Sequence, residues 1–176
     1  MSTTLYELSV ASYLQSVGAV RKVLKKGGEQ AAAAGQDVDE LVQLRLHDTM
    51  LPMSFQIVSV VHHSLGAVKG LRAGEFGPPS GYPAELDFAG WQAFLDDAHT
   101  ELQAIDADEI NGLAGKAVHF RMGSVEIPFT AENFVMSFSL PNLYFHATTT
   151  YDLLRMHAVK LGKADYLGWL RKGLPA

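Results

Sequence analysis

Apolar residues recur at alternating steps of four and three along the first part of the chain. The positions that form this stripe are Tyr6, Val10, Tyr13, Val17, Val20 and Leu24. This spacing predicts one long amphipathic helix whose apolar seam packs against neighbouring helices in a bundle. Thr4 and Glu7 match the T-x-x-E capping box, which predicts the start, and Gly27–Gly28 predicts the end.

Three more helices follow from the same type of pattern. A short helix is expected near Asp37 to Leu44, and a second long helix from about Pro52 to Leu71. The glycine- and proline-rich stretch GEFGPPSGYP then interrupts the chain. Asp87 is a suitable N-cap for a third long helix, Phe88 to about Ile105, with Trp91, Leu95 and Leu102 facing inward.

The period changes to two between Lys116 and Phe129. Apolar residues alternate on both sides of Gly123–Ser124, which predicts a small β-hairpin. Thr130 then starts another helix, and Pro141 is expected to break or kink it. The last long helix is predicted from Asn142 to about Leu161, before Gly162. Residues 1–176 are therefore expected to form one mainly helical domain.

Composition excludes several classes of function. The 176 residues are 48% hydrophobic, with 14 Lys and Arg against 19 Asp and Glu, a formal charge of −5. This balance offers no basic surface for nucleic acid. The basic group Arg21, Lys22, Lys25 and Lys26 is interpreted as a solvated helix end.

Cysteine is absent, so neither a disulfide nor a thiolate ligand is available. No signal peptide is evident, and no segment approaches the roughly 20 apolar residues that cross a bilayer. We therefore expect a cytoplasmic protein without a membrane partner.

Histidines are the main candidates for chemistry. His146 and His157 lie eleven residues apart, so on one helix they share a face but are separated by about 16 Å along its axis. They cannot bind one ion together, because zinc–imidazole bonds are only about 2 Å long. His62 falls on the apolar face of the second long helix with Phe55 and Leu65, and the next residue, His63, on a polar stripe. His62 is therefore the inward candidate, and a small change in helical phase would exchange the two.

Four segments carry a resemblance to a known family. They read LYELSVASYL, RLHDTMLPMSFQI, FSLPNLYFHATTTYDLLR and LGKADYLG, and together they extend from about Leu5 to Gly168. They resemble a bacterial family with a domain of unknown function in the DinB/YfiT-like superfamily. The resemblance implies an all-α, DinB-like four-helix bundle, with the predicted β-hairpin inserted before the last long helix, and a homodimer.

The resemblance also implies a divalent-metal site in much of the superfamily, made by one histidine of the second helix and an H-x-x-x-H pair of the last helix. His62 and His146 match two of these positions, and the position four residues after His146 is Thr150. A threonine hydroxyl is a poor ligand for zinc or nickel. His63, Asp48 and Thr150 are further candidate ligands.

Two hypotheses of function follow from these residues. The first is a metal-free dimer that binds a small molecule or has a regulatory role, with Tyr144, Thr150 and Tyr151 lining its pocket. The alternative is a divalent-metal-dependent transferase or hydrolase with a degenerate histidine site. The first is preferred because the H-x-x-x-H pair is incomplete, and a single inward histidine is usually hydrogen-bonded to a neighbouring polar group.

Overall fold

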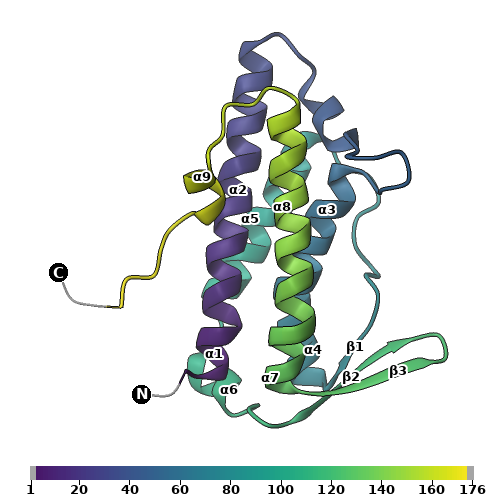
Figure 1. Ribbon diagram of the computed structural model, residues 1–176, viewed down its shortest axis with the longest axis vertical. Coiled ribbons are helices and arrows are strands. Elements are labelled where there is room, and N and C mark those ends of the chain that lie inside the picture. Colours follow the sequence, from purple (N-terminus) through teal and green to yellow (C-terminus); the bar gives the residue numbers. More distant parts are fainter. Residues whose placement is uncertain (1–2, 174–176) are drawn as a thin grey trace.

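The computed structural model describes residues 3–173, and in this part the chain is mostly helical with a small three-stranded sheet (Figure 1). The long helical segments run side by side as columns. They are α2 (Val10–Ala33); α3 (Met53–Val61) with η2 (His62–Gly66) and α4 (Ala67–Ala73); α5 (Phe88–Gln103); and α7 (Ala131–Asn133) with η3 (Phe134–Ser139) and α8 (Leu140–Met156). Helix α2 packs against α5 and α8, and α3 also packs against both. Each column therefore buries an apolar face against two others.

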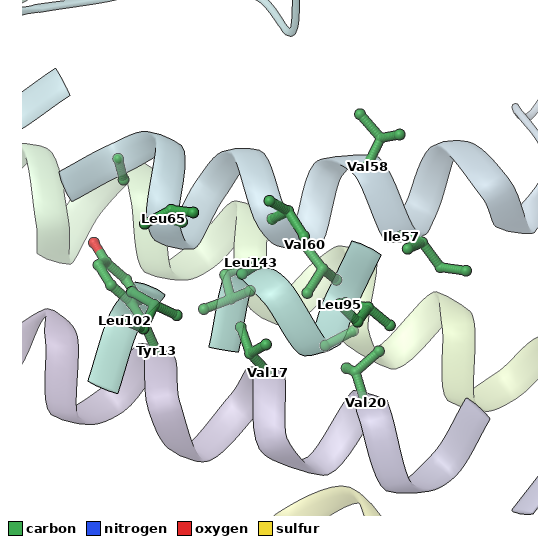
Figure 2. Close-up of a cluster of buried hydrophobic side chains, with 14 of the residues drawn as sticks. Tyr13, Val17, Val20, Ile57, Val58, Val60, Leu65, Leu95, Leu102 and Leu143 are labelled. Carbon is green, nitrogen blue, oxygen red and sulfur yellow. The ribbon is translucent and has the colours of Figure 1, made fainter. Parts of the chain in front are cut away.

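The core fills the space between these columns. Figure 2 shows Val17 and Val20 of α2 and Ile57 of α3 pointing into a shared interior. These side chains are at most 3% exposed, as are Leu95 of α5 and Leu143 of α8. Burial of branched aliphatic side chains from these columns supplies the main driving force for their association.

The first helix begins as predicted and ends later than predicted. The capping box at Thr4 and Glu7 is present at the start of α1 (Leu5–Leu8), and α2 follows after Ser9. Gly27 and Gly28 do not end α2, which continues to Ala33. A Cβ on Gly27 would lie 2.8 Å from Leu154, and one on Gly28 2.4 Å from Phe88. These glycines allow close helix packing rather than a helix stop.

The connection after α2 contains a 3₁₀ helix, η1 (Val38–Gln43), where the sequence predicted a short helix. The second long helix is confirmed over Met53–Ala73. Its middle turn, η2, is a π-helix, which the sequence pattern did not predict. Gly74 ends the column in the left-handed conformation, at φ 71°.

Helix α5 also matches its prediction. The Asp87 side chain accepts a hydrogen bond from the Gly90 N–H at 2.7 Å, as an N-cap does. Trp91, Leu95 and Leu102 are buried. The short α6 (Ala107–Asn111) follows and leads into the sheet.

The predicted hairpin is present as β2 (Ala117–Met122) and β3 (Val125–Thr130), paired antiparallel. A third strand was not predicted. The two residues of β1 (Glu75–Phe76) pair in parallel with His119 and Phe120 of β2. The loop after α4 is thereby tied to the hairpin, and the sheet projects from one end of the helical columns (Figure 1).

The last helical column differs from prediction at two points. Pro141 does not break it, because Pro141 stands in the first turn of α8, directly after the π-helix η3. Helix α8 ends at Met156 rather than near Leu161, and Ala158 follows in the left-handed region at φ 65°. The short α9 (Lys163–Leu167) then lies beside α2 (Figure 1). Among the described residues, no helix combines the length and apolar character needed to span a membrane.

Candidate functional site

Three histidines lie together where η2 meets α8. His62 and His63 are 6% and 7% exposed, and His146 is half-buried. The ring centroids are 5.0 Å apart for His62 and His63, and 5.8 Å apart for His63 and His146. The helical pattern of the sequence favoured His62 over His63 as the inward residue. His62 and His63 are both buried, because the π-turn is wider than an α-turn and changes the angle between neighbouring side chains.

His62 has a complete set of hydrogen bonds. Its Nε2–H donates to the carbonyl oxygen of Gly77 at 2.9 Å, and its Nδ1 accepts from the Tyr82 hydroxyl at 3.2 Å. The ring also stacks on Phe76, with centroids 4.4 Å apart. Because a carbonyl can only accept, the contact with Gly77 places a proton on Nε2, and burial, which lowers the pKa of His62, favours the neutral ring with Nδ1 as acceptor. Both nitrogens of His62 are used in holding the loop after β1.

His63 is the next residue of η2, and apart from the shared contact with Phe76 its environment is different. Its ring is nearly parallel to that of His146, at an interplanar angle of 9°, and packs near Phe76 and Phe138. In the part of the chain that the structure describes, His63 Nδ1 is the one buried side-chain nitrogen or oxygen without a hydrogen-bond partner. Such an unpaired group costs about 1–3 kcal/mol, so its presence requires an explanation.

His146 is oriented by Gln56 of α3. Its Nδ1–H donates to Gln56 Oε1 at 2.7 Å, and Gln56 Nε2 donates in turn to the carbonyl of Leu51 at 2.9 Å. The amide is thus fixed at both ends, and the lone pair of His146 is placed on Nε2. Phe55 and Phe145 contact the ring edge-on, with centroids 6.1 and 5.2 Å away.

Burial keeps these imidazoles neutral at pH 7. Desolvation, followed by the nearby charges that His62 and His146 would carry, lowers the pKa of His63 to about 3. Desolvation also lowers the pKa of His146 to about 4, with a further contribution from His62. The pKa of His62 is lowered as well, chiefly by burial. Neutral imidazoles can act as hydrogen-bond acceptors or as metal ligands.

The donor set does not fit a firmly held zinc or nickel ion. Such ions in proteins take three or four ligands, whereas His62 has no free nitrogen and only His63 and His146 remain. Residues 3–173 contain no group of three or more His, Asp or Glu side chains arranged to hold a metal. Asp48 is exposed in the loop before α3, and the Thr150 hydroxyl donates to the carbonyl of its own helix at His146.

The predicted pocket residues separate in the structure. Tyr144 and Tyr151 line a cavity of about 380 Å³ between α2, α8 and α9. Thr150 is fully buried and is not among the residues that line it. Two residues that position the histidines, Gln56 and Tyr82, were not singled out from the sequence. Gln56 lies on the same stripe as His63, but its partner is 90 residues away, so spacing alone could not identify it.

Comparisons with known proteins agree with this architecture. The family model described as "Domain of unknown function (DUF1993)" matches residues 5–167. The crystal structure of a DinB family member protein from Shewanella denitrificans superposes with a TM-score of 0.80 at 23% sequence identity, covering 97% of this chain and 96% of that one. The search of curated proteins finds no match. The fold is thus DinB-like, as the resemblance implied, and the chain belongs to the DUF1993 family.

Proposed function

We propose that the protein binds a small polar molecule at His63 and His146 without a resident metal ion. One observation carries this proposal: His63 Nδ1 is buried and unpaired next to a second neutral imidazole. A ligand with hydrogen-bonding groups would satisfy His63 Nδ1 and the free Nε2 of His146. Ring nitrogens form hydrogen bonds in the plane of the ring, so such a molecule would lie at the edges of the two nearly parallel rings, whose centroids are 5.8 Å apart.

The surroundings favour a neutral ligand with a planar or apolar part. Phe138 lies beside His63, and Phe55 and Phe145 lie beside His146. Burial, which lowers the pKa of both His63 and His146, also disfavours a charged ligand beside them. Small-molecule sites commonly combine such an aromatic lining with a few polar groups.

The alternative is a divalent-metal-dependent transferase or hydrolase. Gln56 supports it, because histidines that bind metals usually donate their second ring N–H to an oxygen acceptor, as His146 does. A bound ion would lower the pKa of a coordinated water. This alternative needs a third ligand beyond His63 and His146.

A thermal-shift screen of protein purified without a polyhistidine tag separates the two functions. Neutral metabolites, zinc and nickel are tested on wild type, His63→Leu, His146→Ala and the control His157→Ala, which changes an exposed histidine at the end of α8. A ligand at 100 times its Kd stabilises the native state by about 2.7 kcal/mol. We expect shifts with neutral compounds that disappear in His63→Leu and His146→Ala but persist in His157→Ala. A shift produced by metal alone and lost in His146→Ala would favour the metal enzyme instead.

The proposed assembly is a homodimer of four-helix bundles in the cytoplasm. The resemblance to DinB-like proteins supports it, together with exposed apolar side chains such as Met136 and Phe145. Sedimentation equilibrium would distinguish a dimer from the 19.1 kDa monomer.

A further inference from the structure

A groove with a different lining lies away from the histidines. It lies between α2 and α5, where the segment after α9 crosses, and has a volume of about 760 Å³. This volume is within the range of sites that hold small molecules. Neither His63 nor His146 lines it.

The groove is strongly cationic in a chain whose net charge is −5. Arg21, Lys22 and Lys25 of α2 line it together with Arg171, and the single carboxylate of the lining is Asp96, which pairs with Arg21. Within residues 3–173, Lys22 forms no salt bridge. Lys25 lies 3.9 Å from Glu29 on the outer face of the same helix, so Lys22 is the α2 cation of this lining that has no carboxylate partner among the described residues.

This location revises the interpretation of the basic group as a helix end. Helix α2 continues to Ala33, so Arg21, Lys22 and Lys25 lie well inside the helix and gain little from its dipole. Lys26, the fourth residue of the basic group, forms a salt bridge with Asp165 of α9 instead. The dipole therefore does not explain why three cations meet at the groove.

The floor and one edge of the groove are apolar. Leu14 and Leu95 line the floor, and Gly18 leaves it open, because a Cβ at Gly18 would lie 3.3 Å from His99 Nε2. Trp169 forms part of the edge and is 76% exposed. Burial, followed by the charge of Arg21, lowers the pKa of His99, so this histidine adds no charge at pH 7.

The segment that carries Trp169 is held on both sides. The Gln15 side chain donates to the carbonyl of Leu167 at 2.9 Å, and Arg171 donates to the carbonyl of Glu7 at 3.0 Å and to Ser12 Oγ at 3.3 Å. These contacts tie the segment to α1 and α2 at Glu7, Ser12 and Gln15. The exposed Trp169 indole lies between these two attachment points and is available for contact with a ligand.

We propose that this groove binds a small soluble organic anion, with its carboxylate or phosphate at Lys22, Lys25 and Arg21 and its aromatic or acyl part against Leu14 and Trp169. Charge complementarity carries the choice of ligand: four cationic side chains face one paired carboxylate above an apolar floor. Arginine and lysine bind carboxylate and phosphate through charge-assisted hydrogen bonds. The site is independent of the proposed function at His63 and His146.

Calorimetric titration with phenyl phosphate and 3-phenylpropionate tests this proposal, with 3-phenylpropionamide as the neutral match. Tryptophan emission provides a second readout, since Trp91 is 1% exposed and Trp169 is therefore the tryptophan that a ligand in the groove would contact. We expect both anions to bind, the amide to bind at least about tenfold more weakly, and added salt to weaken the anions alone. Failure of both anions to bind, or equal binding of the amide, would overturn the proposal.

Variants then locate the site. The double variant Lys22→Gln/Lys25→Gln should weaken anion binding by about tenfold or more, whereas Lys116→Gln, an exposed lysine at the sheet, should leave it unchanged. Both should unfold at the same temperature as wild type, because the altered side chains are exposed. Equal anion affinity of the two variants would contradict the proposed location of the binding site. If the protein is a dimer that only the double variant dissociates, and the anions do not bind, the groove is a subunit interface and the proposal is wrong.

Discussion

The two neighbouring histidines of the π-turn η2 differ in their hydrogen-bond partners. His62 uses both nitrogens to hold Gly77 and Tyr82 of the following loop. His63 packs against His146 of α8 and has a buried nitrogen that no described group satisfies. Adjacent histidines with equal burial can thus have different roles, one structural and one available for a ligand.

The largest expected difference is in stability. His62→Leu should destabilise the protein by about 3 kcal/mol, because it removes two hydrogen bonds and leaves the Gly77 carbonyl unpaired. His63→Leu should change stability by less than about 1 kcal/mol, since it removes an unpaired nitrogen. Urea denaturation at pH 7 measures both. Equal losses of stability in the two variants would show that His62 and His63 contribute equally.

Acid should reveal the histidines that are kept neutral. The folded-state pKa of His63 is about 3 and that of His146 about 4, both below the ordinary value of 6.5. The unfolded chain therefore takes up protons first, and stability falls as the pH drops below 6.5 and is constant above it. Each of the two histidines should contribute a loss of about 2 kcal/mol between pH 6.5 and 5. Urea denaturation across this range should show a shallower slope for His63→Leu than for the control His157→Ala.

Gln56→Glu should raise the pKa of His146 more than that of His62. A carboxylate in place of the amide oxygen would favour the imidazolium, so the pKa of His146 should rise by about one unit or more. NMR titration of the ring protons measures this change. The pKa of His62, whose partners are Gly77 and Tyr82, should change less; an equal rise at His62 would indicate a general rearrangement of the cluster.

Tyr82→Phe should produce the smallest loss of stability among these variants. It removes the hydroxyl that donates to His62 Nδ1, which should cost about 1 kcal/mol in thermal or urea unfolding. Tyr144→Phe is the matched control, because Tyr144 is 43% exposed and its hydroxyl has water as an alternative partner. A loss in Tyr144→Phe as large as in Tyr82→Phe would argue against the role of Tyr82 in holding His62.

Local signals in the sequence predicted much of the fold. The capping residues Thr4 and Asp87 mark helix starts correctly, and the period of two marks the β2–β3 hairpin. Gly27–Gly28 misled the prediction because a glycine that packs against another helix has the same sequence appearance as one that ends a helix. Strand β1 was missed because two residues are too few to show a period.

The candidate site was less predictable for a related reason. The choice between His62 and His63 assumed a regular α-helix, and a π-turn at these residues changes the angle between neighbouring side chains. The partners of the histidines come from distant parts of the chain: Gly77 and Tyr82 from a loop, and Gln56 from a facing helix. Long-range hydrogen bonds of this kind leave no periodic pattern in a single sequence.

The most direct test of the central claim is the protonation state of His63 and His146 in the folded protein. Long-range ¹H–¹⁵N correlation spectra of ring-labelled histidine report the tautomer and the pKa of each imidazole, with assignments from His63→Leu and His146→Ala. We predict that both rings stay neutral at pH 5, that His146 carries its proton on Nδ1, and that a bound ligand shifts the nitrogen signals of both. A pKa near 6.5 for His63 would show that it is hydrated rather than held in a dry site, and would contradict the account.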